Sequence, residues 1–283
     1  MILRPFQQVD VFTEAPYRGN PLAVVLDGSG LSAEAMQQFT DWTNLSECTF
    51  LLPPTDEGRA AGADYRVRIF CPGRELPFAG HPTLGSCHAW LAAGGTPRGE
   101  HVVQECGVGL VPIKRDGGRL AFAAPPLRRS GPLDEADVDL IARGLGLARD
   151  EIVAHAWCEN GPPWRGVMLR SAEQVLAVRP DAAVLAGMEV GLVGPQTAGT
   201  DTAFEVRAFF HTAQTLCEDP VTGSLNAALA QWLIGAGLAP DRYVAAQGTA
   251  MARQGRVHVE RDASGAIWIG GRSHTCIEGQ VRL

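Results

Sequence analysis

Residues 65–70 read Tyr-Arg-Val-Arg-Ile-Phe, and residues 204–209 read Phe-Glu-Val-Arg-Ala-Phe. In both stretches apolar side chains alternate with polar or small ones, which is the period of a β-strand with one buried face. The two stretches share this alternation, and both begin with an aromatic residue and end with phenylalanine around a central Val-Arg pair. We therefore interpret them as corresponding strands of two similar halves, and this repeat decides the predicted fold.

A small-residue apolar helix follows each of these strands. The first is predicted from Gly80 to Trp90, and the second runs to Trp232 after the turn 219–224 (Asp-Pro-Val-Thr-Gly-Ser). Pro82 and Pro220 suit the first turn of a helix, because proline has no N–H to leave unpaired there. Both helices are apolar nearly all round, which is typical of a helix buried on every side. A sheet is therefore expected to wrap around each one.

The repeat extends to strands on the C-terminal side of each helix. Residues 102–104 correspond to 257–259, and 120–122 correspond to 267–269. The predicted fold class is α+β, with two duplicated domains that each curl a mainly antiparallel sheet around a buried central helix. Since a single core stops growing near 250–300 residues, two domains also suit a chain of 283 residues. The predicted domains are 1–126, which a strand over 274–283 could complete, and 127–273; a surface helix is expected over 134–147.

Composition excludes several classes of protein. The chain is 46% hydrophobic and 19% charged, which is a globular composition, and its net charge of −7 comes with no run of Lys or Arg. We therefore expect neither a nucleic-acid partner nor a membrane partner. The N-terminal residues resemble a strand and not a signal peptide, so the expected location is cytoplasmic. The seven cysteines form no CxxC pair, which predicts reduced thiols that are mostly buried.

The starts of the two central helices are candidates for an anion site. Helix N-termini present unpaired backbone N–H groups and a positive dipole end. If the two ends meet in a cleft between the domains, amides near Gly80, His81, Gly223 and Ser224 could hold a substrate carboxylate. The alternative is that both turns only cap buried helices.

Glu47 is the candidate acid and base. It lies where the polar turn 44–46 enters the apolar stretch 48–52. Desolvation at such a place raises the pKa of a carboxyl toward the range of a general base, and one carboxyl can both accept and return a proton. The alternative is a solvated turn residue or a local capping interaction.

His81 and Asp219 could join Glu47 if the helix ends meet. Helix amides beside His81 could keep its imidazole neutral and oriented, although the histidine could also cap its own helix. Asp219 precedes Pro220 and is predicted as a helix N-cap, with a catalytic role only in a shared cleft. A metal site formed by the three residues is not favoured, since no HxxxH-type spacing is present.

Several motifs in order resemble one family. The chain is similar over nearly its whole length to the PhzF-like family, within the diaminopimelate-epimerase-like fold. The motifs that carry the resemblance are Gln8-Val9-Asp10-Val11-Phe12, Gly19-Asn20-Pro21-Leu22-Ala23-Val24-Val25, Asn44-Leu45-Ser46-Glu47, Glu75-Leu76-Pro77-Phe78-Ala79-Gly80-His81-Pro82-Thr83 and Glu218-Asp219-Pro220-Val221-Thr222-Gly223-Ser224.

The resemblance implies a site between two similar domains and an isomerase or epimerase that needs no cofactor or metal. Glu47 would transfer the proton, with His81 and Asp219 beside it. Gly80, Gly223 and Ser224 would hold the substrate carboxylate. The resemblance also implies a homodimer, and it names trans-2,3-dihydro-3-hydroxyanthranilate as one family substrate without fixing the substrate here. Cys48 and Cys71 replace the more usual threonines, which bears on the shape of the pocket.

Two other functions stay open at this point. The same anion pocket could belong to a protein that binds a small carboxylate or a protein partner without catalysis. A thiol-based racemase, using Cys217 with Cys71 or Cys87, is the other alternative. It is disfavoured because two opposed thiols need matching positions at the two helix starts, and these cysteines do not occupy them.

Overall fold

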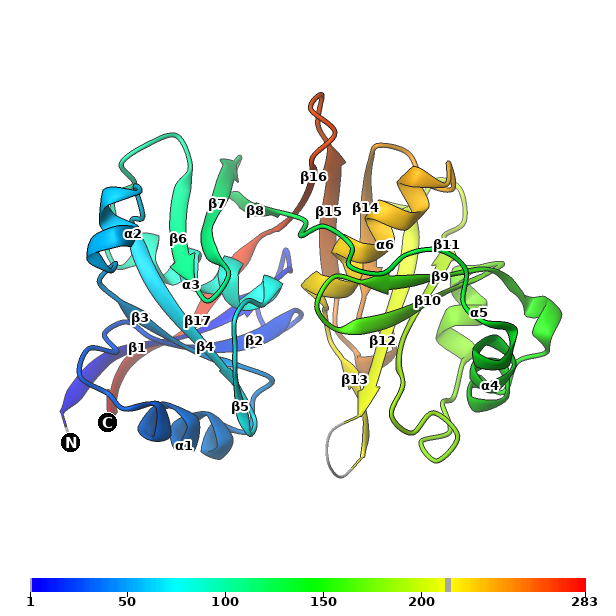
Figure 1. The fold of residues 1–283 in the computed structure, drawn as a ribbon, viewed down its shortest axis with the longest axis horizontal. Helices are drawn as coiled ribbons and strands as arrows, with labels where there is room; N and C mark the ends of the chain where they lie inside the picture. Colours follow the sequence, from blue (N-terminus) through cyan, green and yellow to red (C-terminus); the bar gives the residue numbers. More distant parts are fainter. Residues whose placement is uncertain (1, 212–214) are drawn as a thin grey trace. The chain divides into compact units, whose positions relative to one another are not determined.

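The computed structural model describes residues 2–211 and 215–283, and the chain divides into two compact units. The first unit comprises Met1–Ala123 and Gly270–Leu283, and the second comprises Ala124–Ile269. The end of the chain therefore belongs to the first unit, where β17 pairs antiparallel with β1 from Leu3↔Arg282 to Val11↔Ser273. Figure 1 shows these two strands side by side.

The first unit is built from strands around one long buried helix. Its elements are β1 (Leu3–Val11), β2 (Asn20–Val25), α1 (Ala33–Thr43), β3 (Cys48–Leu52), α2 (Asp56–Ala60), β4 (Tyr65–Cys71), β5 (Arg74–Leu76), α3 (Gly80–Ala92), β6 (Val102–Cys106), β7 (Gly109–Asp116), β8 (Arg119–Ala123) and β17 (Ser273–Arg282).

The second unit repeats this plan and also carries helices on its outside. Its elements are α4 (Glu135–Leu145), η1 (Arg149–Glu151), β9 (Ile152–Glu159), β10 (Pro163–Leu169), α5 (Ala172–Ala177), β11 (Glu189–Pro195), β12 (Phe204–His211), β13 (Leu216–Asp219), α6 (Gly223–Gly235), β14 (Arg242–Gln247), η2 (Thr249–Met251), β15 (Gly255–Arg261) and β16 (Ile267–Gly271), whose last two residues belong to the first unit.

The strand pairings confirm the repeat. In the first unit β4 pairs antiparallel with β5 and parallel with β6, and α3 lies between β5 and β6 in the chain. In the second unit β12 pairs antiparallel with β13 and parallel with β14, with α6 in the same place. The pairs β2–β3 and β10–β11 are both parallel, whereas pairs such as β1–β2, β3–β4, β6–β7 and β14–β15 are antiparallel. The predicted α+β architecture with mainly antiparallel sheets is therefore confirmed.

Each central helix is buried as its composition predicts. Nine of the thirteen residues of α3 are buried, and the helix contacts β1, β2, β3, β6, β8 and β17. Nine of the thirteen residues of α6 are buried as well, against β9, β10 and β15. Small side chains allow this close approach: a Cβ on Gly85 of α3 would lie 2.5 Å from Leu22 Cδ2. The helix is therefore fixed against β2 at that point.

The outer face of each sheet carries a second apolar layer. In the first unit, Met36 and Phe39 of α1 pack on Phe50 and Phe70 of the sheet. In the second unit α4 and α5 cover the sheet with Val138, Ile141 and Val175 among the buried contacts. The predicted surface helix over 134–147 is confirmed as α4, whose acidic first turn is mostly exposed. Each unit thus places a sheet between an outer helix and its central helix.

Candidate functional site

Glu47 lies at the junction of α1 and β3. Asn44, the C-cap of α1, has a positive φ of 56°, which asparagine tolerates and which turns the chain toward β3. Cys48, the first residue of β3, is fully buried and pairs with Ala23 and Phe70. The residue just before it is therefore held at the edge of the packed sheet. The Glu47 side chain is 17% exposed.

His81 lies within reach of Glu47. It is the second residue of α3, it is 4% exposed, and its Nε2 is 3.6 Å from Glu47 Oε2. Its Nδ1 is 3.5 Å from Asn20 Nδ2, at the start of β2. Burial lowers the pKa of His81 to about 3, and a hydrogen bond with the Pro21 backbone opposes this shift. The imidazole is therefore neutral at physiological pH.

Asn20 lies next to the candidate site, and the sequence motifs assign it no role. It is fully buried and lies beside the His81 imidazole. Its local signal is its place in the motif 19–25, directly before Pro21. Its contact with His81 joins residues 61 positions apart, so only the folded sheet brings them together.

The start of α3 offers two backbone donors. The N-cap residue Ala79 makes no side-chain capping hydrogen bond within the described chain. Pro82 has no N–H, and the Thr83 N–H donates to Ala79 O at 3.1 Å. The amides of Gly80 and His81 therefore remain at the positive end of the helix, where they suit an anion.

Asp219 is not the N-cap of α6, and the sequence-based prediction was wrong on this point. The helix begins at Gly223 with Thr222 as N-cap, and Pro220 lies outside it. Asp219 ends β13, where its Oδ2 accepts a hydrogen bond of 2.6 Å from Thr222 Oγ1. The reason is a turn over 220–222 that Gln247 of β14 fixes through the Thr222 N–H and the Asp219 carbonyl.

Ser224 is oriented by two residues of the second unit. Trp164 Nε1 donates to Ser224 Oγ at 3.1 Å, and Asn160 Nδ2 donates to Ser224 O at 2.8 Å. Because Oγ accepts from the indole, its own hydrogen is directed elsewhere. Thr222 makes no side-chain capping bond in the described chain, so the amides of Gly223 and Ser224 also lie at an uncapped helix start.

The predicted site residues fall into two sets. Gly80, His81 and Glu47 lie together in the first unit, and Asp219, Gly223 and Ser224 lie together in the second. Each set has a helix N-terminus close to an acidic side chain. That the two sets line one cleft stays a prediction.

The burial of Cys87 disfavours one of the two cysteine pairs of the thiol alternative. Cys87 is fully buried inside α3, and burial raises the pKa of its thiol to about 12. Burial also raises the pKa of Cys48 to about 11, and its sulfur packs in the core under α1. The cysteine at position 48 is therefore part of that core. Of the seven free thiols, three are buried and four are partly exposed, so the prediction of mostly buried thiols was too strong.

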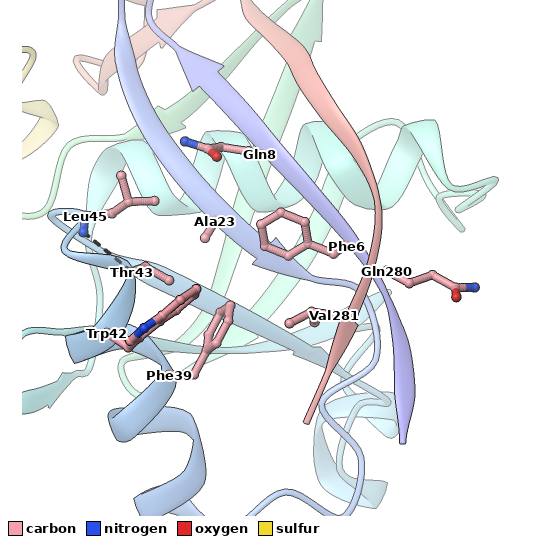
Figure 2. Close-up of a pocket in the computed structure, with 9 residues that line it drawn as sticks. All are labelled: Phe6, Gln8, Ala23, Phe39, Trp42, Thr43, Leu45, Gln280 and Val281. Atoms are coloured by element: carbon pink, nitrogen blue, oxygen red, sulfur yellow. Dashed lines mark hydrogen bonds between the residues drawn. The ribbon is translucent and has the colours of Figure 1, made fainter. Parts of the chain in front are cut away.

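A separate shallow pocket of about 280 Å³ lies beside α1 in the first unit (Figure 2). The rings of Phe39 and Trp42 lie on one side of it and Phe6 on the other, with Leu45 close by. None of the predicted site residues lines this pocket. It therefore gives no support to the site described above.

Neither a membrane-spanning helix nor a metal-binding cluster is found in the described residues. No helix within 2–211 or 215–283 is long and apolar enough to cross a membrane. The same residues contain no group of three or more His, Cys, Asp or Glu side chains that could hold a metal ion.

Comparison with known proteins identifies the relatives of the chain. Residues 9–279 match the family model PhzC-PhzF, described as phenazine biosynthesis-like protein. The protein antisense-enhancing sequence 1 of Schizosaccharomyces pombe is 34% identical over 97% of both chains. Trans-2,3-dihydro-3-hydroxyanthranilate isomerase of Pseudomonas aeruginosa is 32% identical over 97% of this chain and 98% of its own.

Solved structures agree with the fold. A predicted epimerase from Pseudomonas aeruginosa has a TM-score of 0.80 and 26% identity, with 99% of each chain covered. A PhzF-family protein from Bacillus anthracis has a TM-score of 0.83 and 22% identity, and all of both chains is covered. A hydroxyproline epimerase from Agrobacterium vitis reaches 0.61 at 16% identity over 99% and 93% of the chains. The predicted diaminopimelate-epimerase-like fold and the predicted enzyme class, isomerase, are confirmed.

Proposed function

Because this chain belongs to the PhzF-like family of phenazine biosynthesis-like proteins, we propose that it is an isomerase in which Glu47 moves a proton on a small carboxylate-bearing substrate. The observation that carries the proposal is the pair formed by Glu47 Oε2 and His81 Nε2, 3.6 Å apart and shielded from solvent. General acid–base catalysis needs a carboxyl that is held in place and only partly hydrated.

The proton transfer needs one group that both accepts and returns the proton. Glu47 takes the proton from a substrate carbon and delivers it to another position of the same substrate. His81 stays neutral because its pKa is lowered by burial. A neutral imidazole next to Glu47 can orient the carboxyl or accept a hydrogen bond from its protonated form without competing as a cation. Asp219 is the second acidic group of the proposed site.

The helix starts would hold the substrate carboxylate. Gly80 in the first unit and Gly223 and Ser224 in the second present amides at uncapped helix N-termini. The Ser224 hydroxyl adds a donor, because its oxygen accepts from Trp164. These groups supply neutral hydrogen-bond donors and a positive dipole, so the site would need no Arg, Lys or metal to bind the anion.

The relatives support the substrate class that we propose. One of them is named for isomerising trans-2,3-dihydro-3-hydroxyanthranilate, and it is 32% identical over almost the full length of both chains. A small carboxylate with an acidic C–H bond is therefore the class that we propose, without a cofactor. A homodimer is part of the same proposal, and light scattering of the purified protein would test it.

Solvent deuterium exchange tests the function directly. The protein is incubated in D₂O with trans-2,3-dihydro-3-hydroxyanthranilate and with a panel of small carboxylates chosen by ligand-induced thermal shift. We expect deuterium to enter the carbon skeleton of at least one compound that raises the melting temperature. Binding without exchange for every such compound would contradict the proposal and would favour a carboxylate-binding protein.

A further inference from the structure

A fully buried glutamine lies behind the start of α6. Gln247 is the last residue of β14 and is 0% exposed. Its Oε1 accepts from the Thr222 N–H at 3.0 Å and from Asn226 Nδ2 at 2.7 Å. Its Nε2 donates to Asp219 O at 3.1 Å and to Thr222 Oγ1 at 2.9 Å. All four hydrogen-bonding positions of this amide are therefore used.

The backbone fixes the direction of these bonds. The Thr222 N–H can only donate, so it must face Gln247 Oε1. The Asp219 carbonyl can only accept, so it must face Gln247 Nε2. The side-chain amide consequently has one orientation, and Nε2 donates its second hydrogen to Thr222 Oγ1.

The direction of the next bond follows from this orientation. Thr222 Oγ1 already accepts from Gln247, and its own hydrogen points to Asp219 Oδ2 at 2.6 Å. Thr222 is the N-cap of α6, yet its hydroxyl donates to Asp219 and does not cap the helix. Among the described residues, the threonine side chain therefore accepts no hydrogen bond from the first amides of α6. It donates instead to one oxygen of the Asp219 carboxylate.

We propose that Thr222 and Gln247 are positioning residues for Asp219: through the Thr222 hydroxyl they keep Oδ2 as a hydrogen-bond acceptor and hold the carboxylate in one orientation. The inference rests on the proposed function, in which Asp219 is a residue of the site. It adds which oxygen of Asp219 is held by a hydrogen bond within the second unit and which buried residues hold it.

A double-mutant cycle between Thr222 and Asp219 tests the proposal. Thr222→Val removes the hydroxyl and keeps the shape, Thr222→Ser restores a hydroxyl, and Asp219→Ala removes its acceptor. The readouts are kcat and KM for deuterium incorporation into trans-2,3-dihydro-3-hydroxyanthranilate, or into the carboxylate that the screen selects, and the melting temperature of the protein without ligand.

Thr222→Val should lower kcat about 10-fold, because a hydrogen bond to a charged group is typically worth that factor or more. KM should change less, and Thr222→Ser should recover most of the rate. In the Asp219→Ala background Thr222→Val should have no further effect on kcat. An equal loss in both backgrounds, or no recovery by Thr222→Ser, would overturn the proposal, since the threonine would then act on the helix alone.

Gln247→Glu provides a second test, at the residue that donates to Thr222 Oγ1. The change keeps the shape but removes both N–H donors, so the Thr222 hydroxyl can turn to the new carboxylate and leave Asp219. We expect the loss in kcat to match that of Thr222→Val and not to add to it. Full activity of Gln247→Glu would contradict the assigned role of Gln247.

The melting temperature separates this proposal from the proposed function. Thr222→Val should lower it by about 2–4 °C more when Asp219 is present than when residue 219 is alanine, because the bond from Gln247 Nε2 is lost in both backgrounds. Glu47→Gln is measured alongside. If Glu47→Gln keeps the wild-type rate of deuterium exchange, the proposed function fails. The melting temperatures of the double-mutant cycle then still show whether Thr222 and Asp219 interact. If Glu47→Gln abolishes exchange while Thr222→Val changes neither kcat nor melting temperature, only the positioning role fails.

Discussion

His81 Nε2 lies 3.6 Å from Glu47 Oε2, and the imidazole is almost completely buried. The two side chains come from different places in the first unit: Glu47 precedes β3, and His81 is the second residue of α3. Their proximity puts a neutral, oriented ring next to the proposed acid and base. The burial of the ring has a consequence for stability that can be measured without a substrate.

Protonation of His81 should make the protein less stable at acidic pH. Burial lowers the pKa of His81 from 6.5 to about 3, so the unfolded chain binds a proton that the folded chain rejects. The stabilisation is complete above pH 6.5 and is lost as the pH falls toward 3. Its slope is about 1.4 kcal/mol per pH unit. The free energy of unfolding in urea is measured for wild type and His81→Asn between about pH 4 and 8. The difference between the two proteins should change with pH by this slope.

His101→Gln is the control for that experiment, because this histidine lies at a partly exposed position outside the site. It should follow the wild-type pH dependence. If His81→Asn follows the wild type as well, His81 is not a buried neutral imidazole in the folded protein.

The packing of α3 on β2 predicts opposite effects of the same substitution at two glycines. Alanine at Gly85 would place a Cβ 2.5 Å from Leu22 Cδ2 and 2.9 Å from Val11 Cγ2. Overpacking of this kind costs about 1–3 kcal/mol, more than the ~1 kcal/mol that alanine contributes over glycine in a helix. Gly85→Ala should therefore lower the free energy of unfolding in urea by up to about 2 kcal/mol.

Gly235→Ala is the matched change at the end of α6, where an added Cβ would have no described atom within 4 Å. It should leave stability unchanged or raise it by up to ~1 kcal/mol. Equal losses at both glycines would contradict the close packing of α3 on β2.

The repeat could be predicted from the sequence because it rests on local patterns. The alternating pattern in β4 and β12 indicates strands with a buried face, and the apolar composition of α3 and α6 indicates buried helices. The place of Glu47 directly before an apolar strand could also be predicted, and that strand is β3. None of these inferences needed a contact between distant residues.

The wrong N-cap prediction for Asp219 and the missed contact of Asn20 both result from hydrogen bonds between residues far apart in the chain. An Asp-Pro pair is typical of a helix start, but the turn after Asp219 is fixed by Gln247, which is 28 positions away. Asn20 contacts His81 across two elements. Such long-range hydrogen bonds leave no periodic signal in the chain, so sequence patterns could not show them.

Removal of a thiol should not affect the reaction. Cys87 is buried with a pKa raised to about 12, and the proposed mechanism uses no sulfur. Cys217→Ser should therefore exchange solvent deuterium into substrate at the wild-type rate. Cys276→Ser, at another partly exposed cysteine, is the control. Loss of exchange in Cys217→Ser alone would indicate the thiol-based racemase.

Metal removal should also leave the activity intact. The proposed anion site consists of helix amides and the Ser224 hydroxyl, which need no cation to bind a carboxylate. Dialysis against a chelator should preserve deuterium exchange, and elemental analysis should find no stoichiometric zinc. Stoichiometric zinc that disappears together with activity in His81→Ala would contradict a metal-free mechanism.

The most direct test of the account is the rate of solvent deuterium incorporation by Glu47→Gln, compared with Asp219→Asn. The amide keeps the shape of Glu47 but cannot accept a proton, so kcat should fall by about 10⁴-fold, at or beyond the upper end for general acid–base catalysis, with less change in KM. Folding and ligand-induced thermal shift should be retained, and Asp219→Asn should lose less. Near-normal exchange by Glu47→Gln would contradict the central claim that this carboxyl moves the proton.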